Sequence, residues 1–409
     1  MNRENLAKLE DGSTNMVSIN AKSVAASVYH TMVLTQEGSV YATGENGIGQ
    51  LGDGSTSDKN FFVKVFSSDA KAIAAGDTYS MIVRRDGSLW ASGRNTYGQF
   101  GDGNPSYEVP PERPRFVKIV PGGVDAVSAG GAHSIIVKED GSLWASGDNE
   151  FGQLGDRSTT SRRIFAKVIS AGATATGAGS WHSLMLQQDG SVWATGRNTR
   201  GQLGDGTTTD RHSFIKIISS GATAVAAGNI HSMVLKQDGS LWATGANDLG
   251  QLGDPMTAGR NTLTGRQRTV FTKVIPSDVK TVSTRSVYSV ALKHDGSMWI
   301  AGNQYSSNPR REFEVEIFGG VTAVAAGDEY SIMVQQDGTV WASGKNDFGQ
   351  LGDGSKVSTW HGKAFVQGQC QGKSSGPCGK TGTVSRKYWT RHQIAALHHS
   401  AYSLSCVCL

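Results

Sequence analysis

The segment Val225–Asp254, VAAGNIHSMVLKQDGSLWATGANDLGQLGD, occurs in seven close copies along the chain. It contains three runs of strand-forming residues: Val225–Gly228, His231–Lys236 and Leu241–Ala243. The pair Asp238-Gly239 separates the second run from the third. An Asp-Gly pair between two apolar runs predicts a tight hairpin, in which we expect both central residues to have positive φ.

A glycine-rich turn, Asn247–Asp254, follows the third run, and after it the chain returns to a run of apolar residues that begins with Phe. This run predicts a fourth, outer strand, which recurs at Phe62–Phe66, Phe116–Val120, Phe165–Ile169, Phe214–Ile218 and Phe271–Ile275. Each copy is therefore expected to form four antiparallel strands.

The spacing of the copies predicts how the units assemble. The hairpin glycines are Gly38, Gly87, Gly141, Gly190, Gly239, Gly296 and Gly338. They are 49, 54, 49, 49, 57 and 42 residues apart, and four strands in a period near 50 are typical of a β-propeller blade. The 53 glycines among 409 residues agree with a fold rich in tight turns. We predict an all-β protein, a seven-bladed β-propeller of four-stranded antiparallel blades.

The repeated pattern AAG-x-x-H-S-x-x-L, DGS-x-W-A-x-G and N-x-x-GQLGDG resembles the repeat of the regulator of chromosome condensation (RCC1) family, over residues 16–354. The resemblance implies a propeller whose last blade is completed by an N-terminal strand. Met16–Ile19 is the candidate that we favour, and Ala364–Val366 competes with it. The expected organisation is an N-terminal lead at 1–15, the propeller at 16–354 and a poorly ordered basic tail at 355–409.

Strand order predicts which face of the propeller binds partners. The turn between strands one and two and the loop between strands three and four lie on the same face, opposite the Asp-Gly hairpins. That face collects the positions that differ between copies and both long insertions, Asn104–Arg115 and Pro255–Thr269. Aromatic and arginine side chains above a rigid scaffold favour protein binding. The predicted partner contacts are Tyr97, Tyr107, Arg113, Arg115, Phe151, Trp181, Arg200, Arg260, Arg266, Arg268 and Phe348.

The sixth copy departs from the pattern. Arg285 replaces the inner-strand glycine, and no GQLGDG turn follows Gly302. A charged residue near the channel is costly unless it is solvated or paired. We expect Arg285 to reach water from a degenerate blade; the alternative is a ligand contact at the channel mouth.

Repetition argues against catalytic and metal sites. Gly47–Gly52 matches GxGxxG, but it follows a strand and leads to no helix, so we interpret it as a blade turn and expect no nucleotide cofactor. The adjacent His-Ser pairs, such as His231-Ser232, point to opposite faces of a strand and are replaced by Tyr-Ser in other copies, which favours a structural role. The repeated turn aspartates lack the alternating acidic loop of a calcium site.

The tail has a different composition from the repeats. Residues 355–409 contain seven Lys and Arg and no Asp or Glu, so the net charge of +4 for the chain leaves −3 for residues 1–354. The propeller thus gives no electrostatic reason to bind nucleic acid. All four cysteines lie in the tail, at spacings that fit no usual zinc finger. Cys406-Val407-Cys408-Leu409 matches C-a-a-X, so prenylation of Cys406 would attach the protein to a membrane.

We therefore expect a monomeric, non-enzymatic scaffold that binds a protein partner through the loop face. The resemblance implies one alternative, guanine-nucleotide exchange on a Ran-type small GTPase, because one family member has that activity and docks on histones. Another alternative is a secreted inhibitory or sugar-binding propeller. Met1–Asp11 lacks the apolar core of a signal peptide, which predicts a cytoplasmic protein, with the nucleus as the alternative.

Overall fold

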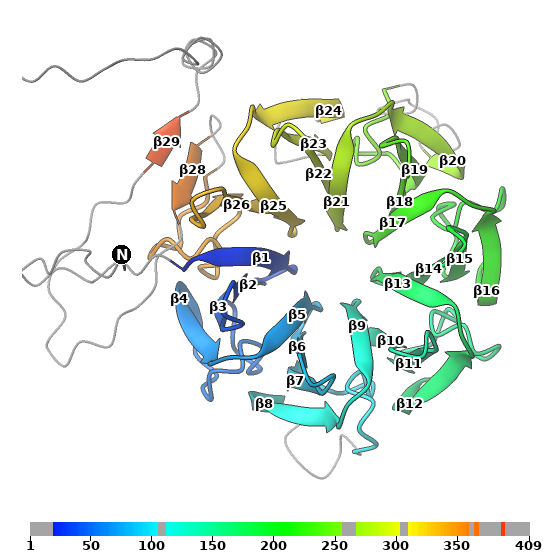
Figure 1. Cartoon of the computed structure of the whole chain (residues 1–409), viewed down its shortest axis with the longest axis horizontal. Helices are drawn as coiled ribbons and strands as arrows, with labels where there is room; N and C mark the ends of the chain where they lie inside the picture. The colour runs from blue at the N-terminus through cyan, green and yellow to red at the C-terminus, as the bar shows by residue number, and fades with distance from the viewer. Residues whose placement is uncertain are drawn as a thin grey trace, which may run out of the picture.

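The chain forms a ring of seven antiparallel sheets around a central axis in a computed structural model (Figure 1). The structure describes residues 19–104, 112–255, 267–302, 310–359, 364–367 and 386–388. Sheets follow one another around the ring in chain order, and we number them as blades 1 to 7. The predicted seven-bladed propeller is confirmed. Within the described ranges, no helix is long and apolar enough to cross a membrane.

The innermost strand of each blade lines the central channel. Small side chains predominate in these strands because seven of them crowd around one axis, and they enclose a cavity of about 300 Å³. The inner strands are β1 (Ala21–Ala26), β5 (Ala70–Ala75), β9 (Val124–Ala129), β13 (Ala173–Ala178), β17 (Ala222–Ala227), β21 (Val279–Arg285) and β25 (Val321–Ala326).

The two central strands of each blade form the core. Neighbouring blades cover both of their faces, so the second strands are almost wholly buried. The second strands are β2 (His30–Thr35), β6 (Tyr79–Arg84), β10 (His133–Lys138), β14 (His182–Gln187), β18 (His231–Lys236), β22 (Tyr288–Lys293) and β26 (Tyr330–Gln335). The third strands are β3 (Val40–Gly44), β7 (Leu89–Arg94), β11 (Leu143–Gly147), β15 (Val192–Gly196), β19 (Leu241–Ala246), β23 (Met298–Gly302) and β27 (Val340–Gly344).

The outer strands begin earlier than the sequence suggested. In blades 1 to 5 they start three or four residues before the predicted Phe, because the preceding residues also pair with the third strand. The outer strands are β4 (Lys59–Phe66), β8 (Glu112–Val120), β12 (Arg162–Ile169), β16 (Arg211–Ile218), β20 (Gln267–Ile275), β24 (Arg310–Ile317) and β28 (Ala364–Gln367).

Blade 7 is closed by the C-terminal candidate. Strand β28 pairs with β27 through Ala342 and Val366, and β29 (Arg386–Tyr388) pairs with β28 as a fifth strand. The preference for Met16–Ile19 as the closing strand was wrong, because β28 occupies the edge of β27 where that strand would pair. All four strands of every blade are thus consecutive in the chain. Blades 7 and 1 meet without a chain connection between them.

The hairpins between the second and third strands differ from the expected geometry. Gly87 has a φ of +74°, but Asp86 is not in the left-handed region. The Gly87 N–H donates to the carbonyl of Arg84, and the N–H and hydroxyl of Ser88 donate to the Asp86 carboxylate. The prediction of two positive φ angles was wrong: only the glycine needs one, because it follows a type I turn.

Candidate partner-binding face

One face of the ring carries the turns between first and second strands and the loops between third and fourth strands. We call it the loop face, and the opposite face, with the Asp-Gly turns, the hairpin face. A seam is the junction of two neighbouring blades, so that seam 3/4 joins blades 3 and 4. On the loop face of seams 3/4 and 7/1, the third-to-fourth loop of one blade lies beside the first-to-second turn of the next. This shared face was predicted, and the contacts confirm it.

Buried polar latches hold most seams together. A His or Tyr at the start of a second strand bonds to a hydroxyl of the next blade, over 2.8 or 2.9 Å. The pairs are His30–Ser80, His133–Ser183, His182–Ser232, His231–Ser289, Tyr79–Ser134 and Tyr330–Thr31. Burial lowers the pKa of each of these histidines to about 3, so the rings are neutral. The structural interpretation of the His-Ser repeats is confirmed.

The aspartates of the glycine-rich turns form ion pairs with basic residues near the start of the outer strand. Asp205 accepts hydrogen bonds from the N–H and hydroxyl of Thr207. It also forms an ion pair with Arg211 at 2.5 Å. Burial by itself would raise the pKa of Asp205, but these bonds hold it below its usual value. Further pairs of this kind are Lys59–Asp53 at 3.2 Å, Arg113–Asp102 at 2.6 Å, Arg268–Asp254 at 2.7 Å and Arg162–Asp156.

Three predicted partner contacts consequently lie in strands. Arg113 and Arg115 belong to β8 and Arg268 belongs to β20, so their placement in loop insertions was wrong. Arg113 and Arg268 are held by turn aspartates, and Arg115 lies against Gly54 of the preceding blade. The sequence misled here because a strand begins inside each insertion, where Arg113-Pro114 and Gln267-Arg268 carry no strong strand signal.

Seam 3/4 brings two predicted aromatic residues together around an arginine. Phe151 comes from the third-to-fourth loop of blade 3 and Trp181 from the first-to-second turn of blade 4, with ring centroids 6.5 Å apart at 71°. Arg197 follows β15, and its Cζ lies 5.0 Å from the Phe151 ring and 4.9 Å from the Trp181 ring. Aromatic faces attract a guanidinium at such distances. All three residues are half-buried.

Seam 7/1 repeats the aromatic pair without the cation. Phe348 of blade 7 and Tyr29 of blade 1 have ring centroids 5.3 Å apart at 71°. At the position of Arg197, directly after the third-strand glycine, blade 1 has Glu45. Burial and then the nearby Asp58 charge raise the pKa of Glu45. The two seams therefore present similar rings with opposite charges.

Two further predicted contacts lie on this face. Tyr97 occupies the position of Phe151 in blade 2, and 49% of it is exposed, because Ala132 stands where Trp181 stands in blade 4. Arg200 occupies the same position in blade 4, and it forms an ion pair with Asp248 at 3.3 Å. Tyr97 is thus an open apolar surface, whereas the charge of Arg200 is already balanced.

Arg285 lies at the channel, but not in water. It is only 6% exposed, lines the channel cavity and forms an ion pair with Asp77 of blade 2. The expectation that its side chain reaches water was wrong, because a carboxylate from across the channel compensates its charge. The pair connects blades 6 and 2 past seam 7/1.

The remaining predicted residues, Tyr107, Arg260, Arg266 and Cys406, lie outside the described residues. Within the part of the chain that the structure covers, no group of three or more His, Cys, Asp or Glu side chains could hold a metal ion. The sequence gives no reason to place a cofactor in this fold.

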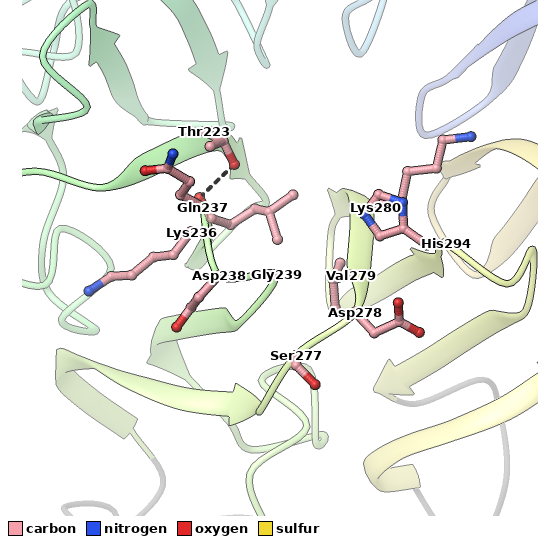
Figure 2. Close-up of a pocket in the computed structure, with 11 residues that line it drawn as sticks. Thr223, Lys236, Gln237, Asp238, Gly239, Ser277, Asp278, Val279, Lys280 and His294 are labelled. Atoms are coloured by element: carbon pink, nitrogen blue, oxygen red, sulfur yellow. Dashed lines mark hydrogen bonds between the residues drawn. The ribbon is translucent and has the colours of Figure 1, made fainter.

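The hairpin face has a polar groove of about 590 Å³ between blades 5 and 6. Figure 2 shows Lys280 and His294 on one side of it and Gln237 and Asp238 on the other. A similar groove of about 390 Å³ lies between blades 4 and 5. Neither groove is lined by Phe, Tyr or Trp, the large aromatic residues that are common anchors in protein interfaces.

Arg197 and Tyr29 were missed by the sequence prediction. Tyr29 aligns with Trp181, which was selected. The position of Arg197 differs from copy to copy, and that variability was the available signal. Its occupants in blades 1 to 5 and 7 are Glu45, Arg94, Asp148, Arg197, Ala246 and Lys345. This position directly follows the glycine that ends the third strand in most blades.

The chain matches family models and is similar to solved structures. The model of the RCC1-like domain matches residues 12–308, and the model of the regulator of chromosome condensation (RCC1) repeat matches residues 321–350. Human WBSCR16 is similar in structure, with a TM-score of 0.69 and 18% identity over 81% of this chain and 94% of that chain.

Two yeast structures are also similar. Prp20p from Saccharomyces cerevisiae, described with its binding properties to Gsp1p and histones, has a TM-score of 0.69 and 18% identity, over 84% of this chain and 88% of its own. Yeast RCC1 (Prp20) bound to Kap60 has a TM-score of 0.66 and 17% identity, over 87% and 89%. At these identities the similarity shows a common fold.

Proposed function

Because this chain belongs to the RCC1-like domain family, we propose that it is a non-enzymatic scaffold that binds a protein partner through its loop face. The observation that carries the proposal is the cluster of Phe151, Trp181 and Arg197 at seam 3/4. Trp, Tyr and Arg are the residues that contribute most binding energy in protein interfaces. Tyr97, exposed on the neighbouring seam, extends this surface.

The rigidity of the scaffold supports the same proposal. Buried latches and turn ion pairs fix the loops on which these side chains stand, so little conformational entropy is lost when a partner binds. The blade residues that could resemble catalytic groups are already used, since His133 and Ser183 bond to each other inside the seam. We accordingly propose binding without chemical conversion of the partner.

Affinity capture with matched variants tests the choice of face. The loop-face variant is Tyr97→Ala with Trp181→Ala, and the control is Lys280→Ala with His294→Ala on the hairpin face. We expect partners captured by the wild type to be lost with the first variant and retained with the second. The opposite pattern would move the binding site to the hairpin groove and refute the proposal.

Nucleotide exchange on a Ran-type small GTPase is the second candidate, and family membership supports it. Release of labelled GDP from the purified GTPase, with and without this protein, separates the two candidates. The scaffold proposal predicts an unchanged release rate. Acceleration that depends on Trp181 would replace it with an exchange function on the same face.

A further inference from the structure

We propose that Arg197 is a carboxylate-binding anchor, and that the partner presents an Asp or Glu side chain beside an apolar residue at seam 3/4. This inference rests on the proposed function and specifies the chemistry of the partner. It is carried by three features of Arg197: its stacking, its unused donors and the contrast with other arginines on the molecule.

The guanidinium of Arg197 is held in place before any partner binds. Its Cζ lies about equally far, 5.0 and 4.9 Å, from the rings of Phe151 and Trp181, and its Nε donates a hydrogen bond to Thr199 Oγ1 at 3.1 Å. Arginine pays less rotamer entropy on binding when its planar group is already fixed. The side chain is therefore preorganised.

Its terminal nitrogens remain available for an incoming anion. An arginine has five N–H donors, and the Nε bond to Thr199 uses one of them. Among the described residues, no carboxylate forms an ion pair with Arg197, and its contacts are with the two rings and Thr199. A planar pair of N–H groups matches the two oxygens of a carboxylate.

Three other arginines of the loop face and its surroundings are already neutralised. Arg200 pairs with Asp248, Arg285 with Asp77, and Arg113 with Asp102. Arg94 occupies the position of Arg197 in blade 2 and, among the described residues, has no carboxylate partner either, but it is exposed and has no aromatic neighbour at cation–π distance. Arg94 is thus a matched control for charge without stacking.

The aromatic rings define the second half of the recognised motif. Trp181 and Phe151 are half-buried and supply apolar surface directly beside the guanidinium. An ion pair at such a site is less exposed to water than one at a flat surface, so its attraction is weakened less by solvent. An acidic residue flanked by an aliphatic or aromatic one satisfies both halves. A basic segment would be repelled.

Random peptides displayed on phage and selected on the folded full-length chain provide the probe. We expect the selected sequences to be enriched in Asp or Glu next to an apolar residue. Synthetic peptides of those sequences should lose affinity about tenfold or more with Arg197→Gln, and similarly when the peptide acid is changed to its amide. Arg197→Lys should restore only part of the affinity, because Lys lacks the planar pair of donors.

The variants distinguish failure of this inference from failure of the proposed function. The control Arg94→Gln should bind as the wild type does, and thermal unfolding checks that every variant is folded. Neutral or basic peptides that require Trp181 but not Arg197 would overturn the carboxylate anchor and leave the face intact. If selection gives no peptide that depends on Trp181 or Tyr97, both the anchor and the loop-face proposal are wrong.

Discussion

Seams 3/4 and 7/1 are built alike and differ in what they expose. Each places an aromatic residue of one blade against an aromatic residue of the next, Phe151 with Trp181 and Phe348 with Tyr29, at the same interplanar angle of 71°. The same turn geometry thus produces the same ring packing at two distant places in the ring. The repeat controls the positions of side chains, and the residues that vary between copies control the chemistry.

Charge separates the two seams. Arg197 lies beside the rings of seam 3/4, whereas blade 1 has Glu45 at that position. Lys345 occupies the same position in blade 7, where its ammonium pairs with Glu329 at 3.4 Å. A partner that suits one seam is therefore disfavoured at the other, since like charges repel across an interface.

The buried latches also differ. Seam 3/4 is held by a neutral histidine, His133, bonded to Ser183, and seam 7/1 by the Tyr330 hydroxyl bonded to Thr31. Histidine can take up a proton at moderately acidic pH, whereas a tyrosine hydroxyl cannot. The two junctions are consequently expected to respond differently to acid.

Chain connectivity is the third difference. The chain passes from β12 of blade 3 into β13 of blade 4, whereas no described segment of the chain leads from blade 7 into blade 1. The ion pair of Arg285 with Asp77 spans this seam from blade 6 to blade 2. The described part of the closing seam is therefore held by noncovalent contacts, which include backbone hydrogen bonds such as Ala21 N–H to the Gly338 carbonyl.

Breaking the two seams equally should reveal the effect of connectivity. Gly152 and Gly349 have φ of +78° and +85°, and an added Cβ would lie 2.6 Å from a backbone Cα of the next blade, His212 or Asn60. We expect Gly349→Ala to lower the free energy of unfolding by about 3–4 kcal/mol and Gly152→Ala by about 2 kcal/mol, because the covalent link limits separation at seam 3/4. Urea unfolding measures both; equal losses would show that the chain connection contributes nothing.

The cross-channel ion pair should show an asymmetric response. Asp77→Asn leaves the buried Arg285 uncompensated, and we expect a loss of about 2–3 kcal/mol in the free energy of unfolding. Arg285→Met removes the buried charge and leaves Asp77, whose side chain is 30% exposed, so about 1 kcal/mol is expected. Thermal unfolding of both variants tests the order. A larger loss of unfolding free energy for Arg285→Met than for Asp77→Asn would contradict the proposal that Asp77 compensates the buried charge of Arg285.

Acid should weaken the histidine seams. The pKa of His133 is lowered to about 3 by burial and then by Arg285, whereas its ordinary value is 6.5. The unfolded chain therefore binds more protons between these values, and stability falls as pH falls from 6.5 towards 3. Each such histidine costs about 1–2 kcal/mol at pH 5.

Exchanging one latch for the other sharpens this test. His133→Tyr gives seam 3/4 the latch of seam 7/1, and we expect a shallower loss of unfolding free energy between pH 7 and pH 5. Urea midpoints at those two pH values provide the measurement, and the pH 7 value controls for misfit of the new ring. An unchanged pH dependence would mean that His133 does not carry the acid response.

Removing one ring from each seam should have the smallest, but most specific, effect. With the selected acidic peptides, we expect Trp181→Ala to weaken binding about tenfold and Tyr29→Ala less than about twofold, since seam 3/4, unlike seam 7/1, combines its two rings with a free cation. Fluorescence titration with labelled peptide measures both. A stronger effect of Tyr29→Ala would place the main contact at seam 7/1.

Local patterns were sufficient to predict the blades because their causes are local. The Asp-Gly turn, the small-residue inner strand and the Phe that begins the fourth run each follow from the pairing of neighbouring strands. The loop face followed from strand order. The same reasoning placed Phe151 and Trp181 on that face, and the structure adds that they touch.

Other features of the site escaped prediction because they depend on contacts between distant residues. Arg285 and Asp77 are 208 residues apart, and no local pattern indicates that they meet across the channel. Arg113 was assigned to a binding loop because nothing in the local sequence indicates that it pairs with Asp102. Arg197 was passed over since its importance comes from rings contributed by two different blades.

The sequence by itself determined the number of blades, their strands and the face that carries variable residues, because each repeat encodes its own hairpins and turns. Only the tertiary structure decided that β28 closes the ring, that Arg285 is paired and that Arg197 stands free between Phe151 and Trp181. Closure and seam contacts join residues from separate repeats, and their energies depend on distances that no single repeat specifies.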